Sequence, residues 1–151
     1  MDWTDMEQAI SAATGEPFRV REAVPVGGGC INEAARLEGD GRRFFVKLNS
    51  AERLPMFEAE AAGLRAILAS DSLLAPRPLG SGTSDGRSWL VLEHIEFGTG
   101  GARSSEELGT GLAALHRCTG AAFGWDRDNT IGATPQVNTP TPDWVTFFGN
   151  Q

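Results

Sequence analysis

The sequence is poor in the residues from which disulfide frameworks and metal sites are built. Its 151 residues include two cysteines, Cys30 and Cys118, and two histidines, His94 and His116. Two cysteines are too few for a disulfide framework, and these four residues do not form a metal-ligand cluster. His116 and Cys118 stand two apart in an expected helix, so their side chains point to different faces. We therefore expect no metal site within this chain.

Excess positive charge and long apolar runs are also missing. The formal net charge is −7, whereas a surface that binds nucleic acid is basic. No apolar run is long enough to cross a bilayer. The first five residues, Met1 to Asp5, are acidic where a signal peptide would be basic. These absences argue against nucleic acid and membrane partners, and they predict a cytoplasmic protein.

The first part of the chain contains the hydrophobic patterns of a small sheet with helices. Apolar residues recur at helical spacing, and β-branched or aromatic runs are separated by glycine-rich turns. The patterns predict a helix over 3–13, an extended segment over 18–26, strands over 31–38 and 42–49, a helix over 54–69, and two strands around the turn at 83–86. This order predicts an α+β fold with a five-stranded antiparallel sheet and one packed helix.

A glycine-rich linker over 98–101 follows the last of these strands and marks the expected domain boundary. We expect one domain over 1–97, and over 98–151 a linker with the beginning of a mostly helical lobe. Ser104 and Glu107 form a capping pattern that predicts the start of a helix. A loop over 120–143 and a helix from Trp144 should follow. Exposed apolar residues of the helix over 108–117 and of the segment over 144–148 predict self-association of the chain.

Two features suggest a phosphate-binding site. They are the run Gly27-Gly28-Gly29-Cys30-Ile31-Asn32 and Lys47, which lies in the apolar strand expected over 42–49. Glycines let the backbone approach a ligand closely. In phosphoryl transfer, a glycine loop covers the nucleotide phosphates and a strand lysine neutralises them. The run matches neither the P-loop nor the spaced Gly-x-Gly-x-x-Gly pattern, and alone it would indicate a flexible hairpin tip. With Lys47, it predicts the small lobe of a kinase-like fold.

A kinase lysine needs a helix glutamate that fixes its ammonium group. Glu58 and Glu60 both lie in the helix expected over 54–69, and their side chains project about 200° apart. Only one of them can therefore face Lys47. Glu60 borders the apolar stripe and is favoured, while Glu58 remains the alternative.

Three further positions complete the candidate nucleotide site, and one residue of the glycine run is also a candidate for oxidation. Glu93, His94 and Ile95 stand where a kinase places the hinge that binds adenine through main-chain groups. Cys30, near loop amides and a cationic site, is a candidate for oxidation that could link two chains. The predicted nucleotide-binding residues are Gly27, Gly28, Gly29, Cys30, Asn32, Lys47, Glu60, Glu93, His94 and Ile95.

Several stretches together resemble the fructosamine kinase (ketosamine-3-kinase) family, within the aminoglycoside-phosphotransferase-like kinases. The most specific is the run from Phe123 to Gly132, continued by Thr134-Pro135-Gln136 and Asn138. The other matching stretches are Gly28 to Asn32, Phe45 to Lys47, Met56 to Glu60 with Leu64, Leu90 to Glu93, Leu112 to His116, and Trp144 with Phe147-Phe148. The resemblance covers essentially the whole chain.

The resemblance implies ATP-dependent phosphorylation of a sugar hydroxyl in a ketosamine, carried by an amine or by a glycated protein. The phosphorylated adduct then falls off, so the activity is a deglycation repair. The family's kinases also need Mg²⁺ and a catalytic Asp, usually in His-Gly-Asp, which this sequence lacks. We expect an N-terminal portion of such an enzyme, inactive alone, with the base and magnesium ligands outside this chain. A kinase for aminoglycosides or choline-like amines, and a non-catalytic nucleotide-binding remnant, are the alternatives.

Overall fold

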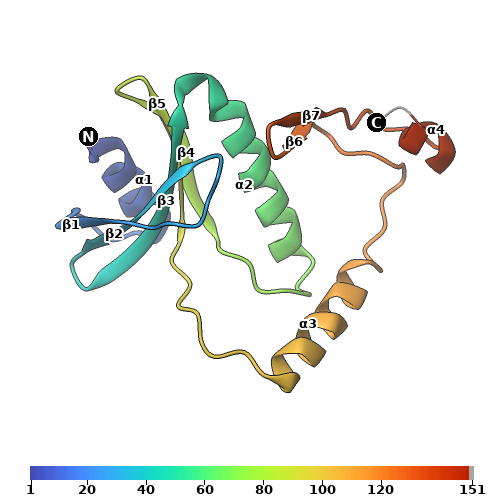
Figure 1. Ribbon diagram of the computed structural model, residues 1–151, viewed down its shortest axis with the longest axis horizontal. Helices are drawn as coiled ribbons and strands as arrows, with labels where there is room; N and C mark the ends of the chain where they lie inside the picture. Colours follow the sequence, from blue (N-terminus) through green and yellow to red (C-terminus); the bar gives the residue numbers. More distant parts are fainter. Residues whose placement is uncertain (150–151) are drawn as a thin grey trace. The chain divides into compact units, whose positions relative to one another are not determined.

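The computed structural model describes residues 1–149, and the chain divides into two compact units (Figure 1). The first unit comprises residues 1–65 and 76–97, and the second comprises residues 66–75 and the chain from Gly98 on. The first contains α1 (Thr4–Thr14), β1 (Glu22–Pro25), β2 (Glu33–Gly39), β3 (Arg42–Ser50), a 3-10 turn (Ala51–Arg53), most of α2 (Leu54–Ala69), β4 (Pro78–Ser84) and β5 (Arg87–Glu93). Among residues 1–149, no helix combines the length and apolar character that crossing a membrane requires.

The first unit is built on one sheet of five strands in the order β1-β2-β3-β5-β4, with every neighbouring pair antiparallel. This confirms the predicted α+β fold and its five-stranded antiparallel sheet. Two of its hairpins close with Asp-Gly turns, at Asp40-Gly41 and Asp85-Gly86, and all four residues have positive φ. Such turns match the twist of the flanking strands, so the sequence fixes both connections locally.

The two faces of β3 have different neighbours because successive side chains on a strand point to opposite sides. Phe44, Val46 and Leu48 are buried in a cluster with Met6 and Ile10 of α1. Phe45 packs on the other face, in a second cluster formed by α2 and β5: Phe57, Ala61, Leu90 and Leu92, with Met56 and Leu64 partly buried. The sheet is therefore covered by α1 on one face and by α2 on the other (Figure 1).

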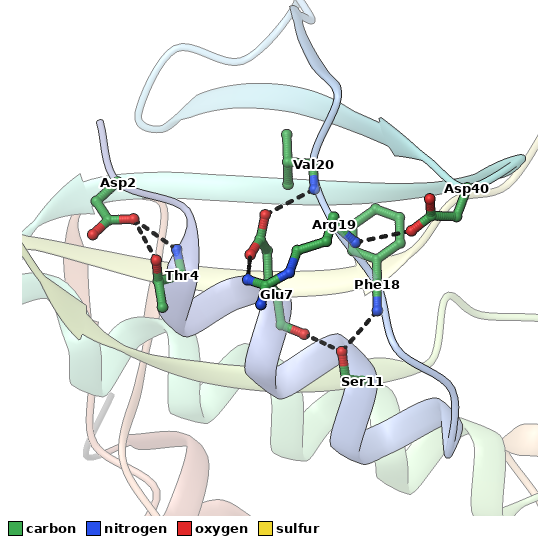
Figure 2. A network of polar contacts seen from close by, with 8 residues as sticks. All are labelled: Asp2, Thr4, Glu7, Ser11, Phe18, Arg19, Val20 and Asp40. Carbon is green, nitrogen blue, oxygen red and sulfur yellow. Dashed lines mark hydrogen bonds and ion pairs between the residues drawn. The ribbon is translucent and has the colours of Figure 1, made fainter.

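Side chains hold three residues of the segment before β1, as Figure 2 shows, while the N–H of Arg21 donates to the Glu38 carbonyl of β2 (2.8 Å). The N–H of Phe18 donates to the Ser11 hydroxyl (2.9 Å), and the N–H of Val20 donates to the Glu7 carboxylate (2.8 Å). The N–H of Arg19 donates to Asp40 (3.1 Å). Within the segment predicted to be extended over 18–26, the strand β1 covers Glu22–Pro25.

The same network begins at the start of α1 (Figure 2). The Asp2 carboxylate accepts hydrogen bonds from the hydroxyl (2.6 Å) and the N–H (3.0 Å) of Thr4. These bonds lower the pKa of the Asp2 carboxyl. They also satisfy one of the N–H groups that a helix leaves unpaired at its first turn, which fixes where α1 begins.

The second unit contains α3 (Ala102–Leu115), a hairpin of β6 (Asn129–Ile131) and β7 (Thr134–Gln136), and α4 (Trp144–Gly149). The predicted cap at Ser104 was wrong, because the helix begins two residues earlier and Gly101 is its N-cap. The region expected to be loop over 120–143 includes the small hairpin. Asp143 accepts a hydrogen bond from the N–H of Thr146 (2.6 Å), which starts α4, and bonding to Thr146 lowers the pKa of the Asp143 carboxyl.

We predict that Gly39→Ala strongly destabilises the first unit. A Cβ at Gly39 would lie 1.8 Å from the carbonyl oxygen of Arg19, and the Glu7 and Asp40 bonds hold that backbone in place. The free energy of unfolding should fall by at least about 2 kcal/mol, as in other overpacked sites. Urea unfolding followed by tryptophan fluorescence measures the change. Gly27→Ala is the matched control, since a Cβ there meets no atom within 4 Å; equal stability of the two variants would contradict the prediction.

Candidate nucleotide site

The centre of the candidate site is an ion pair between β3 and α2. The Lys47 Nζ lies 2.6 Å from the Glu60 Oε1, and both side chains are 28% exposed. Lys47 shares the α2 face of the sheet with Phe45, and the residues opposite it in the ladder are Ala34 and Leu90. The pair therefore stands at the margin of an apolar cluster, where its charges are partly shielded and remain reachable from solvent.

The structure distinguishes the two glutamates that the sequence left open. Glu60 faces Lys47, whereas the side chain of Glu58 is exposed. Helical geometry explains the difference: Phe57 and Ala61 are buried against β5, and Glu60, next to them on the helix, reaches Lys47 on the central strand β3. The apolar stripe of α2 thus decides which carboxylate can reach the strand.

The glycine run forms the connection between β1 and β2, closed at its base by a hydrogen bond from the Val26 N–H to the Ala34 carbonyl (2.9 Å). Gly28 has a φ of 111°, a conformation that residues with a β-carbon rarely adopt. The loop borders a hollow of about 430 Å³. Lining residues come from the loop and from the two adjacent strands, and include Gly27, Gly28, Gly29, Cys30, Asn32, Phe45 and Lys47. The loop and the lysine therefore share one hollow.

Asn49 is a residue of this region that the sequence analysis did not single out. Its side-chain Nδ2 donates to the Oδ1 of Asn32 (2.7 Å) and to the carbonyl of Ile31 (3.1 Å). Its own Oδ1 accepts the N–H of Ser50 (2.8 Å). The side chain of Asn32 is thus bonded to β3. An amide two residues after the strand lysine was the available signal, because it shares the face of that lysine.

The predicted hinge residues lie at the end of β5, with Glu93 as its last residue. The N–H of Glu93 donates to the Arg77 carbonyl (2.9 Å), and its carboxylate accepts the Arg77 N–H (3.4 Å). His94 is partly buried and Ile95 is exposed, both outside any strand. Glu93 lies three residues beyond Leu90, the ladder partner of Lys47, so the structure does not bring these residues against the ion pair. It places them at one end of the strand that runs beside β3.

Thiols and metal ligands are sparse in this part of the protein. Cys30 and Cys118 are both free and exposed. Across residues 1–149, no three His, Cys, Asp or Glu side chains are grouped closely enough to hold a metal ion. The described residues therefore place a cation, Lys47, and the glycine loop at the hollow, and they contain no cluster of carboxylates for Mg²⁺.

The second unit holds its own polar cluster around Asn138, which is 6% exposed. The Asn138 Nδ2 donates to the Arg127 carbonyl (3.1 Å) and to the Oδ1 of Asn129 (2.9 Å). Its N–H donates to Asp128 (2.8 Å), and its carbonyl accepts the N–H of Trp125 (2.9 Å). The run from Phe123 to Asn138 is thus folded back on itself by one buried amide.

Taken together, the loop, Lys47 and Glu60 can bind a polyanion. Loop N–H groups and an ammonium group attract phosphate oxygens. The Glu60 carboxylate bonds to the ammonium group and so orients the cation. Among kinases, a strand lysine paired with a helix glutamate does this for the phosphates of ATP.

Comparison with known proteins finds relatives of this chain. The sequence pattern of the family described as fructosamine kinase matches residues 2–151. A Synechocystis protein described as a probable ketoamine kinase is 50% identical over 97% of this chain and 50% of its own length. The chloroplastic protein-ribulosamine 3-kinase of Arabidopsis thaliana is 40% identical over 91% of this chain and 43% of its own length. The chain therefore spans about half the length of these curated relatives.

Solved structures give the same result. A crystal structure from Haemophilus somnus, described as a fructosamine-3-kinase, superposes with a TM-score of 0.90 at 27% identity, over 97% of this chain and 50% of that one. A second, from Thermobifida fusca, gives 0.76 at 28% identity, over 96% and 50%. These likenesses confirm the kinase-like fold predicted from the sequence. With the family pattern matched along residues 2–151, the chain belongs to the fructosamine kinase family.

Proposed function

We propose that this chain supplies the nucleotide-binding part of an ATP-dependent kinase that phosphorylates ketosamines. The observation that carries the proposal is the Lys47–Glu60 ion pair, whose lysine lines the same hollow as the glycine loop. The loop N–H groups and the Lys47 ammonium bind the phosphates, and Glu60 keeps the ammonium in place. Glu93 to Ile95 present main-chain groups to the adenine.

The proposed organisation is a small lobe over residues 1–97, followed by the start of a second lobe. The first compact unit ends at Phe97, and the last part of the second unit begins at Gly98. This division supports a boundary there. Mg²⁺ is the metal that such kinases use to neutralise the phosphates. The described residues do not fit it, since no group of three potential ligands occurs among them. No step in this part of the protein therefore passes through the metal.

The ketosamine substrate is inferred from the relatives. The Synechocystis relative is described as a probable ketoamine kinase and the Arabidopsis relative as a protein-ribulosamine 3-kinase. Both names describe enzymes acting on sugar adducts of amines. We extend that substrate class, as free ketosamines or glycated proteins, to the protein that contains this chain.

We expect nucleotide affinity to depend on the ion pair. Lys47→Met should weaken ATP binding at least roughly tenfold, because hydrogen bonds to charged groups are among the strongest polar contacts. Glu60→Gln keeps the shape of the side chain but removes its charge, and should weaken binding roughly threefold to tenfold. Titration of the chain with ATP, followed by NMR, measures both effects.

Glu58→Gln is the matched control, since it makes the same change on the exposed side of the same helix. Its affinity should equal that of the unchanged chain. Equal affinities for the Glu58 and Glu60 variants would contradict the assigned role of the pair. If the Lys47→Met variant bound ATP as tightly as the unchanged chain, the nucleotide would have to bind elsewhere.

The substrate class is tested by an ATP-consumption assay with a ribulosamine or fructosamine acceptor. We expect turnover in the protein expressed from the complete reading frame, and none in residues 1–151 alone, because the catalytic Asp and the magnesium ligands are not found in this sequence. Turnover with an aminoglycoside or choline instead would replace the substrate assignment. ATP binding without turnover by either protein would support a non-catalytic role.

We further propose that Cys30 is a redox-sensitive position of the glycine loop. Its thiol is free and exposed beside the hollow, so an oxidant can reach it. Peroxide treatment followed by non-reducing electrophoresis should give a disulfide-linked dimer that Cys30→Ser abolishes and Cys118→Ser retains. A dimer that depends on Cys118 would overturn the assignment. Light scattering in the presence of a reductant detects self-association through apolar surface separately, because no disulfide forms there.

A further inference from the structure

The glycine loop has few contacts of its own. Gly27, Gly28, Gly29, Cys30 and Ile31 are all exposed, and a Cβ at Gly27 or Gly28 would meet no atom within 4 Å. Glycine-rich backbone is also costly to order, since it has the most conformations to lose. A loop of this kind needs an anchor outside itself if its N–H groups are to stay directed at one place.

The side chain of Asn49 provides such an anchor from β3. Its Nδ2 bridges two groups at the end of the loop, the Oδ1 of Asn32 at 2.7 Å and the carbonyl of Ile31 at 3.1 Å. The Ser50 N–H, 2.8 Å from the Asn49 Oδ1, identifies which end of the amide is oxygen. Turning the amide over would lose all three bonds, so its orientation is determined.

The position of Asn49 on the strand links this anchor to the ion pair. Asn49 and Lys47 lie two residues apart on β3, and therefore on the same face with Cα atoms about 7 Å apart. The strand β3 thus carries both Lys47, the cation for the phosphates, and Asn49, whose side chain anchors the loop that covers them. The spacing between loop amides and ammonium group is set by a rigid element.

We propose that Asn49 is a positioning residue of the phosphate site, acting through Asn32 and the Ile31 carbonyl to hold the glycine loop at a fixed distance from Lys47. The proposal rests on the nucleotide site proposed above. It assigns to Asn32 a role in shaping the loop.

The test is a double-mutant cycle read in two ways. Asn49→Ala and Asn32→Ala should each increase the backbone mobility of Gly27 to Cys30, measured by ¹⁵N relaxation in the free chain. Asn49→Ala should also weaken ATP binding about tenfold, since it removes both hydrogen bonds of the anchor, and Asn32→Ala should weaken it less, since it removes one of the two. The double variant should be no worse than Asn49→Ala alone, because the shared bond can be lost only once.

Glu33→Ala is the matched control at the same end of the loop. Glu33 pairs with Arg87 (2.9 Å) and is 73% exposed. Its ladder partner is Leu48, so it lies on the opposite face of the sheet. Loss of an exposed pair has little effect, and loop relaxation and ATP affinity should stay unchanged.

Two results would overturn the proposal: unchanged loop relaxation in Asn49→Ala, or effects of Asn49→Ala and Asn32→Ala that add in full. The relaxation measurement needs no nucleotide. It therefore separates a failed anchor from a failed nucleotide site: if the unchanged chain binds no ATP, the function proposed above fails, while the loop relaxation still decides whether Asn49 is the anchor. Asn32→Ala, at a partly exposed loop position, keeps the test available if Asn49→Ala does not fold.

Discussion

The site depends on one constraint, the burial of β3 from both sides. Val46 is fully buried between its neighbours on the α1 face, while Phe45 packs against the α2 cluster on the other. A slip of one residue would exchange the two sets of side chains and turn Lys47 into the α1 cluster. The cost of burying an unpaired ammonium there is several kcal/mol. The apolar core thus fixes which face carries the lysine.

The Lys47–Glu60 pair itself adds little to the stability of the fold. Both side chains are 28% exposed, and exposed or half-exposed pairs contribute about 1 kcal/mol or less. Its significance lies in orientation, because α2 is placed by Phe57 and Ala61 and the pair only joins two elements that are already packed. A site built in this way can be occupied by phosphates without disturbing the core that supports it.

Local patterns were sufficient to predict much of this arrangement. The bounds of α2, the Asp-Gly hairpins and the nomination of Glu60 all follow from periodicity or turn chemistry within a short window. The start of β1 at Glu22 could not be predicted, because the N–H groups of Phe18, Arg19 and Val20 bond to side chains as distant as Asp40. The start of α3 was predicted at the wrong residue. The capping pattern at Ser104 lies inside the helix, because Gly101, whose backbone is extended, is the N-cap. Asn49 was missed because its role depends on a hydrogen bond to Asn32, a residue 17 positions away in the sequence, which the strand pattern alone does not indicate.

The run from Phe123 to Asn138 shows why a specific motif need not contact a substrate. Gly124 has a φ of 118°, and a Cβ there would lie 2.7 Å from the Asn138 carbonyl. The side chain of Asn138 is occupied by Arg127 and Asn129. These demands for a glycine and an amide arise from the internal packing of the segment. Its value as a family marker is therefore accounted for structurally, and the ketosamine assignment must be supported by the relatives and by turnover measurements, independently of this motif.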